Sequence, residues 1–201
     1  MIAIIDYGAG NIKSLQFALT KLNMESCLTT DKQTIKNASA IILPGVGAFK
    51  DAIEALGKFD LIRTIQQEAS SGKPLLGICL GMQLFYDRSY EDGDWQGLGL
   101  LHGDVIRIAD SVKVPHMGWN TLSHHQNTPL LNSIKEDAYV YFVHSYAVSS
   151  YQQEDLVSSA DYGGLVPAVV QKGNITGMQF HPEKSGEVGL QLLQNFGEMI
   201  S

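Results

Sequence analysis

The segment that indicates the fold is Pro74-Leu75-Leu76-Gly77-Ile78-Cys79-Leu80-Gly81-Met82-Gln83. Its apolar first half predicts a short buried strand, and a helix is predicted from Leu80 to about Asp87. Two similar apolar runs, at 2–5 and 40–43, precede it, and each leads into a glycine-containing turn. Short apolar strands that alternate with amphipathic helices are typical of a parallel sheet covered on both faces. The first half is therefore predicted to be α/β.

The first apolar run leads into a predicted turn and helix. Gly8-Ala9-Gly10 forms the turn, Asn11 can cap the helix, and Ile12, Leu15, Leu19 and Leu22 share one helical face.

The second half of the chain is richer in β-branched and aromatic residues. Strands are predicted within 98–108, 139–148 and 166–180, with a hairpin turn at Lys172-Gly173-Asn174, and a closing helix runs over about 185–200. No linker, repeat or low-complexity tract interrupts the chain. The pattern predicts one domain over residues 1–201, with a mixed, largely parallel central sheet, helices on both faces and antiparallel additions in the second half.

Length, charge and cysteine content narrow the classes of function. The chain has 201 residues, 44% of them hydrophobic, which suits one domain with a sizeable core. A net charge of −7 argues against nucleic acid and anionic membranes as partners. Cys27 and Cys79 imply no disulfide framework, and the start of the chain resembles neither a leader nor a membrane anchor. We expect a cytoplasmic protein.

Gly77-Ile78-Cys79-Leu80-Gly81 matches a nucleophile elbow, a sharp strand-to-helix turn that carries the attacking residue. Glycines without Cβ atoms allow the strand and helix to approach closely, and the helix start supplies a free N–H at Leu80 and favours a thiolate. The alternative is a buried structural cysteine beside glycines needed for packing.

His181-Pro182-Glu183 offers a base and a carboxylate for that sulfur. Pro182 favours an extended conformation at His181, so Glu183 can reach one imidazole nitrogen while the other faces the thiol. Alone, this tripeptide would be a loop with a solvated carboxylate. Together with the elbow it predicts a Cys-His-Glu triad.

Pro44-Gly45-Val46-Gly47 could be a plain turn or a source of N–H groups for an oxyanion, and it ends a strand at the same sheet edge as Cys79. The chain lacks a complete nucleotide-binding glycine pattern. The histidines other than His181 have no metal-ligand spacing: His102, His116, His124, His125 and His144. We expect no metal and no cofactor.

With these pieces in chain order, the sequence resembles the triad (class I) glutamine amidotransferases. Within them it is similar to the glutaminase subunits of imidazole glycerol phosphate synthases. The motifs that carry this resemblance are Asp6-Tyr7-Gly8-Ala9-Gly10-Asn11, Leu43-Pro44-Gly45-Val46-Gly47-Ala48-Phe49, Gly77-Ile78-Cys79-Leu80-Gly81-Met82-Gln83, Pro115-His116-Met117-Gly118-Trp119-Asn120, Tyr141-Phe142-Val143-His144-Ser145-Tyr146 and Gln179-Phe180-His181-Pro182-Glu183-Lys184-Ser185.

The resemblance implies a class I glutamine amidotransferase-like fold and specific roles. Cys79, His181 and Glu183 would form the catalytic triad that releases ammonia from glutamine. The oxyanion and the substrate would be bound by Val46, Gly47, Leu80, Gln83, Glu91, Ser145 and Tyr146, with Asp92 or Asp94 as alternatives to Glu91 for the substrate ammonium.

The resemblance also implies a partner, a separate (β/α)8-barrel cyclase subunit. It would use the ammonia to make imidazole glycerol phosphate and aminoimidazole carboxamide ribotide in histidine biosynthesis. Its contacts on this chain would be Tyr141, Lys184 and a turn formed by Met117, Gly118, Trp119 and Asn120. Two alternatives remain at this point. One is another Cys-His-Glu amidotransferase or a free-standing cysteine amidase on the same α/β frame, and the other is a regulatory or binding module that keeps an inert elbow.

Overall fold

The computed structural model describes residues 1–8 and 12–200. The predicted turn residues Ala9 and Gly10 and the predicted helix cap Asn11 lie outside this part of the chain. The strands of its largest sheet are β1 (Ile2–Ile5), β2 (Ser26–Thr29), β3 (Ala40–Gly45), β4 (Leu75–Cys79), β9 (Ser123–His124), β12 (Leu156–Asp161), β13 (Leu165–Lys172) and β14 (Ile175–Met178).

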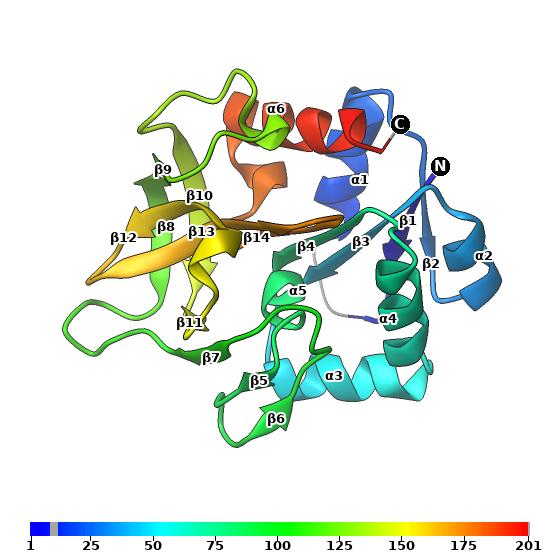
Figure 1. Ribbon diagram of the computed structural model, residues 1–201, viewed down its shortest axis with the longest axis horizontal. Helices are drawn as coiled ribbons and strands as arrows, with labels where there is room; N and C mark the ends of the chain where they lie inside the picture. Colours follow the sequence, from blue (N-terminus) through cyan, green and yellow to red (C-terminus); the bar gives the residue numbers. More distant parts are fainter. Residues whose placement is uncertain (9–11, 201) are drawn as a thin grey trace.

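This sheet has the order β2-β1-β3-β4-β14-β13-β12-β9 (Figure 1). The strands from β2 to β14 run parallel, and β13, β12 and β9 continue the sheet in antiparallel pairing. The mixed, largely parallel sheet predicted from the sequence is confirmed. The hairpin at 172–174 is confirmed too, since β13 and β14 pair antiparallel on either side of it.

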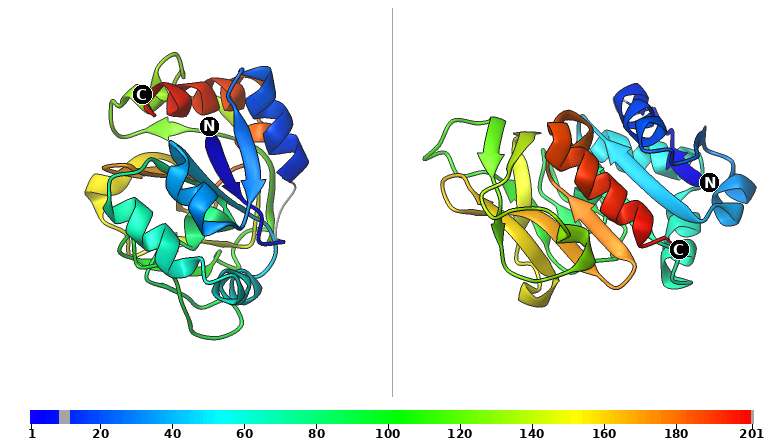
Figure 2. Two further views of the ribbon diagram at one scale, coloured as in Figure 1. Left: turned by 90° about the vertical axis from the view of Figure 1, so that its right-hand side faces the viewer. Right: turned by 90° about the horizontal axis from the view of Figure 1, so that it is seen from above.

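Helices cover both faces of the parallel half (Figures 1 and 2). They are α1 (Ile12–Lys21), α2 (Lys32–Asn37), α3 (Phe49–Lys58), α4 (Ile62–Ser70), the short α5 (Leu80–Gln83) and α6 (Gly186–Glu198). Ile2 and Ile4 of β1 pack in a core with α1 and α6, whereas Ala3 and Ile5 pack in a second core with α2, α3 and α4. Alternate residues of a strand face opposite sides, so an entirely apolar strand serves both cores.

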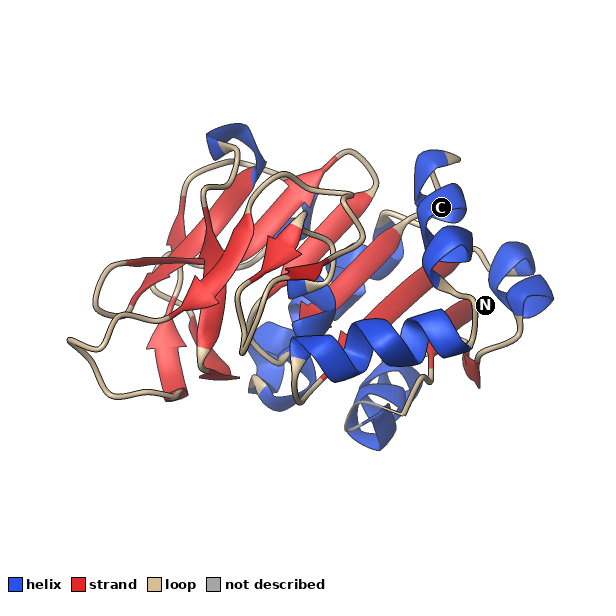
Figure 3. Cartoon of the chain, turned by 90° about the horizontal axis from the view of Figure 1, so that it is seen from below, coloured by secondary structure: helices blue, strands red, loops and turns tan. Residues whose placement is uncertain are grey.

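The second half adds two small sheets. One contains β5 (Arg88–Ser89), β6 (Trp95–Gln96), β7 (Asp104–Arg107) and β11 (Tyr146–Ser149), and the other pairs β8 (His116–Thr121) with β10 (Tyr139–His144). Three 3-10 turns complete the elements: η1 (Pro129–Leu131), η2 (Gln153–Asp155) and η3 (Pro182–Lys184). Figure 3 shows these strands gathered at one end of the molecule and the helices at the other.

Three predicted elements differ in length from those observed. The helix expected over 80–87 ends at Gln83, because residues 98–101 donate their N–H groups to the carbonyls of Leu84, Phe85 and Tyr86. Only 104–107 of the strand predicted over 98–108 forms. The strand predicted over 139–148 breaks at Ser145 into β10 and β11, which belong to different sheets.

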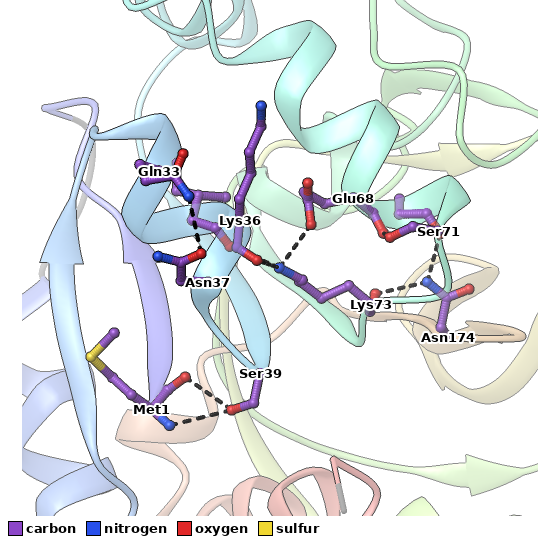
Figure 4. A network of polar contacts seen from close by, with 11 residues as sticks. Met1, Gln33, Lys36, Asn37, Ser39, Glu68, Ser71, Lys73 and Asn174 are labelled. Carbon is purple, nitrogen blue, oxygen red and sulfur yellow. Dashed lines mark hydrogen bonds and ion pairs between the residues drawn. The ribbon is translucent and has the colours of Figure 1, made fainter.

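The amino ends of the parallel strands are tied together by polar side chains (Figure 4). The Lys73 ammonium donates to the carbonyls of Ile35 and Lys36 and pairs with Glu68 at 2.7 Å. The Asn174 amide donates to the carbonyls of Ala69 and Lys73, both at 2.8 Å. These contacts tie together the end of the sheet at which the parallel strands begin. The site lies at the opposite end, where these strands finish.

Among residues 1–8 and 12–200, none of the helices has the length and hydrophobicity that a membrane span requires.

Candidate active site

Cys79 is the last residue of β4 and directly precedes α5. Its backbone has φ +55° and ψ −112°, a conformation that costs an L residue roughly 1–3 kcal/mol. A Cβ on Gly81 would lie 1.7 Å from the Leu43 carbonyl oxygen, and one on Gly77 would lie 2.7 Å from the Met82 backbone. Both glycines are therefore required for the close approach that creates the sharp turn. Since α5 has a single turn, its dipole adds less than the longer predicted helix would have given.

His181 and Glu183 follow β14, the strand beside β4. Glu183 Oε1 lies 2.8 Å from His181 Nδ1, and both side chains are almost fully buried. The tripeptide is not a continuation of the strand, because β14 ends at Met178 and Glu183 lies in η3. His181 keeps the extended conformation favoured by Pro182, with φ −100° and ψ 98°.

The second nitrogen of His181, Nε2, is buried and forms no hydrogen bond of ordinary geometry within the described chain. Burial alone would lower the pKa of His181, but interactions with the Cys79 thiol and the Glu183 carboxylate raise this pKa to about 9. A proton on the imidazole is thus stabilised from both sides.

The segment Pro44-Gly45-Val46-Gly47 lies directly beside the elbow. Gly45 pairs with Cys79 in the β3–β4 register, and a Cβ on Gly45 would lie 2.5 Å from the Tyr7 hydroxyl. Gly47 has φ +97°, which favours glycine. Gly45 and Val46 also line a small cavity together with His181 and Glu183.

A cavity of about 370 Å³ opens in front of the sulfur. Its lining includes all seven residues expected to bind the oxyanion or the substrate: Val46, Gly47, Leu80, Gln83, Glu91, Ser145 and Tyr146. Cys79, Pro115, Val143 and His144 complete it. The cavity has room for an amino acid, and its walls come from both halves of the fold.

Glu91, the expected ammonium partner, is half-buried at the cavity wall. Its Oε2 accepts a hydrogen bond from the Phe49 N–H at 2.7 Å, and burial raises the pKa of its carboxyl group. Asp92 and Asp94, the alternatives, do not line the cavity, and Asp94 pairs with Arg88. Of the three carboxylates, only Glu91 lines the cavity.

Residues 3–199 match the family described as glutamine amidotransferase class-I. Over 200 residues, and the full length of both chains, the sequence is 66% identical to the imidazole glycerol phosphate synthase subunit HisH of Oceanobacillus iheyensis. The chain belongs to the class-I glutamine amidotransferases.

Solved structures show the same amidotransferase fold. A crystal structure of a glutamine amidotransferase aligns with TM-score 0.80 at 17% identity, covering 99% of this chain and 98% of that chain. The structure of PurLQS from Thermotoga maritima aligns with TM-score 0.79 at 22% identity, covering 100% and 98%. The predicted fold class is therefore confirmed.

Sequence reasoning missed one side chain of this amidotransferase that contacts the nucleophile. Gln179 is fully buried, and its Nε2 donates to Cys79 Sγ at 3.8 Å, while its Oε1 accepts from Gln83 Nε2 at 3.0 Å. The sequence held a signal for it, because Gln179 is the first residue of the motif Gln179-Phe180-His181-Pro182-Glu183-Lys184-Ser185 that carries the family resemblance.

The turn predicted at Met117-Gly118-Trp119-Asn120, as part of the surface for a partner, does not form. Met117, Gly118, Trp119 and Asn120 lie in β8, paired with β10, where Tyr141 packs edge-on against Trp119. Met117 and Trp119 are 62% and 55% exposed, and Lys184 is exposed as well. Asn120 instead directs its amide to His116 Nε2 and the Asp161 carbonyl.

No group of three or more His, Cys, Asp or Glu side chains that could hold a metal ion occurs within residues 1–8 and 12–200.

Proposed function

We propose that this chain hydrolyses glutamine through Cys79 and supplies the ammonia to a separate cyclase subunit that makes imidazole glycerol phosphate and aminoimidazole carboxamide ribotide. The observation that carries the proposal is the strained Cys79 beside a buried His181–Glu183 pair at the mouth of an amino-acid-sized cavity. Full-length identity of 66% to a HisH subunit supports the biosynthetic assignment.

In the first half of the reaction, the Cys79 thiol gives its proton to His181 and the sulfur attacks the side-chain amide carbon of glutamine. Glu183 holds the imidazole by its Nδ1 hydrogen bond and stabilises the cation, in keeping with the raised pKa of His181. His181 then returns the proton to the amide nitrogen. The carbon–nitrogen bond breaks, ammonia leaves, and a glutamyl thioester remains.

The oxyanion that forms in this step needs two donors close to the sulfur. The N–H of Leu80 and an N–H of the Val46-Gly47 segment would supply them, and the position of both segments in the cavity lining beside Cys79 supports this role. Losing one such donor typically costs about 2.7–4 kcal/mol of transition-state stabilisation. In the second half, His181 accepts a proton from water, the hydroxide displaces the sulfur, and glutamate departs.

The rest of the pocket would orient glutamine. Glu91 would pair with the substrate ammonium through the oxygen that does not bond to Phe49, and Gln83, Ser145 and Tyr146 would contact the polar groups of glutamine.

The exposed residues of β8 and β10 together with Lys184 would form the surface for a (β/α)8-barrel cyclase. Free thiols at Cys27 and Cys79 support a reducing compartment, the cytoplasm, and the shared central sheet supports a single domain.

Labelling with an electrophilic glutamine analogue tests the nucleophile. We expect modification of Cys79 while Cys27 is spared, because only Cys79 lies at the cavity. Equal labelling of both cysteines, or none, would mean that the elbow is inert.

Replacing the nucleophile tests whether this chain hydrolyses glutamine while the cyclase carries out the synthesis. Cys79→Ala in complex with the cyclase should abolish glutamine-dependent synthesis and leave synthesis from added ammonia intact. Loss of both activities would show that Cys79 is needed for assembly instead of catalysis.

A further inference from the structure

Two buried histidines outside the triad contact each other at the cavity wall. His116 begins β8 and His144 ends β10, and the antiparallel register places them directly opposite one another. Their exposed fractions are 2% and 6%, and His116 Nδ1 lies 2.9 Å from His144 Nε2. The His116 ring is stacked between Phe142 and Tyr162, with centroid distances of 4.5 and 3.8 Å. Both rings are therefore held in fixed orientations.

The partners at the two ends fix the direction of the hydrogen bonds. His144 Nδ1 lies 2.9 Å from the Tyr146 carbonyl, which can only accept, so Nδ1 carries the proton. At the other end, Asn120 Nδ2 donates to the Asp161 carbonyl and faces His116 Nε2 at 3.2 Å, so this nitrogen accepts. All the hydrogen bonds then point in one direction: Asn120 donates to His116, His116 donates to His144, and His144 donates to the Tyr146 carbonyl.

This series of hydrogen bonds requires both imidazoles to be neutral. A second proton on either ring would place two N–H groups face to face or leave Asn120 opposite a donor. Burial lowers the pKa of His116 and the pKa of His144 to about 4, so both rings are neutral at physiological pH.

The series of hydrogen bonds ends at Tyr146, where the backbone passes from the sheet of β10 to the sheet of β11. The bond from His144 to the Tyr146 carbonyl spans Ser145, the bend between β10 and β11. The same carbonyl accepts a second hydrogen bond from Gln83 Nε2 at 2.9 Å. Gln83, His144, Ser145 and Tyr146 all line the cavity. Two residues of the cavity lining, His144 and Gln83, thus donate to this one carbonyl.

We propose that His116 and His144 are positioning residues of the glutaminase site, whose hydrogen bonds hold the Ser145–Tyr146 bend, and Gln83 with it, in the geometry that binds glutamine. The inference rests on the proposed function and deepens it. Neither histidine takes a proton from the substrate in this scheme.

The tautomers give a test that does not depend on activity. Long-range ¹H–¹⁵N NMR of the full chain at neutral pH should show His116 and His144 as neutral imidazoles with the proton on Nδ1. This is a distinctive result, because the Nε2–H form usually predominates in water. A protonated ring, or the Nε2–H form at either residue, would overturn the proposal.

Kinetics of the complex with its cyclase test the positioning role. His116→Phe keeps a ring between Phe142 and Tyr162 but removes both nitrogens, so kcat/KM for glutamine should fall roughly three- to tenfold, mainly through KM. His102→Phe, at an exposed histidine outside the cavity, serves as the matched control and should keep the parent KM. Equal KM values in the two variants would overturn the proposal.

A pair of substitutions at His144 separates its hydrogen bond from its volume. His144→Asn keeps a donor for the Tyr146 carbonyl, whereas His144→Leu keeps bulk without a donor, so KM should rise more with Leu than with Asn. The reverse order contradicts the proposal.

If a variant fails to fold, the tautomers measured on the parent chain decide whether the proposal holds. A parent complex that does not hydrolyse glutamine at all would refute the proposed function, whereas unchanged KM in the variants of an active complex refutes the positioning role alone.

Discussion

The sulfur of Cys79 has hydrogen-bond contacts on two sides besides its interaction with His181. Gln179 donates an N–H to it, and its own S–H faces the Val143 carbonyl at 3.8 Å. An N–H donor stabilises the thiolate relative to the thiol, whereas a carbonyl favours the thiol. The donor from Gln179 is therefore the contact whose removal tests how its surroundings affect the sulfur.

We predict that Gln179→Leu slows alkylation of Cys79 by iodoacetamide roughly two- to tenfold at neutral pH, since a buried donor to the sulfur is lost. Mass spectrometry of the labelled peptide measures the rate. Gln171→Leu is the control, because Gln171 lies in β13 and the hydrogen bond described for its side chain is with Thr128, away from Cys79. An unchanged rate in Gln179→Leu would show that the 3.8 Å contact has no influence on the thiolate.

Glu91 provides a second prediction for a single residue. In Glu91→Gln the amide oxygen can still accept from the Phe49 N–H, but the charge is lost, so KM for glutamine should rise roughly tenfold or more. Glutaramate, which lacks the α-amino group, should show no such difference between parent and variant.

Acidification should also raise KM for glutamine in the parent enzyme, because protonation removes the same charge from Glu91. Because the pKa of Glu91 is raised by burial, KM for glutamine should begin to rise at a higher pH than an exposed glutamate would give. A KM that is flat down to pH 4 would exclude this role.

At the scale of elements, the elbow depends on two glycines with no space for a side chain. Gly81→Ala should lower the free energy of unfolding by roughly 3 kcal/mol, because its Cβ would collide with the Leu43 carbonyl. Gly57→Ala in α3 is the matched control, since its Cβ meets only Ile62 at 3.9 Å and should stabilise the helix by about 0.5–1 kcal/mol. Urea denaturation measures both, and equal effects would contradict the packing argument.

The sequence predicted β1, β3 and β4 well, because each is a short buried apolar run with a glycine at its end or within three residues of it. It missed β2, whose residues Ser26–Thr29 are only partly buried and are not uniformly apolar. Through the resemblance it also named seven residues that line one cavity in the structure, and their binding roles stay predictions. The lengths of α5 and β10 were wrong because both elements end through long-range contacts: residues 98–101 take the carbonyls after α5, and β7 pairs with β11. The pairing of His116 with His144 depends on the β8–β10 register across 28 residues, and no local pattern encodes it.

At the scale of the whole molecule, three buried histidines predict a stability maximum near neutral pH. The folded-state pKa values of His116 and His144 are about 4, below the ordinary value of 6.5, so the unfolded chain binds more protons as pH falls. The free energy of unfolding should therefore decrease from about pH 6.5 to about pH 4, by up to about 1.4 kcal/mol per pH unit for each histidine.

His181 acts in the opposite direction. Its pKa of about 9 lies above its unfolded value, so its contribution is complete below about pH 6.5 and is lost as pH rises through about 9. Urea denaturation across pH 4–9 should show both slopes. His116→Phe should flatten the acid side and His181→Gln the alkaline side; a profile unaffected by either change would contradict these assignments.

The place of β14 in the sheet has a consequence for biosynthesis of the chain. This strand, residues 175–178, lies between β4 and β13 and joins the parallel strands to the antiparallel ones (Figure 1). On a ribosome, both regions are synthesised before their connecting strand, and the imidazole and carboxylate of the proposed triad follow three and five residues after it. If the proposed triad is correct, a nascent chain carries Cys79 for about a hundred residues of translation without its base, and so cannot consume glutamine.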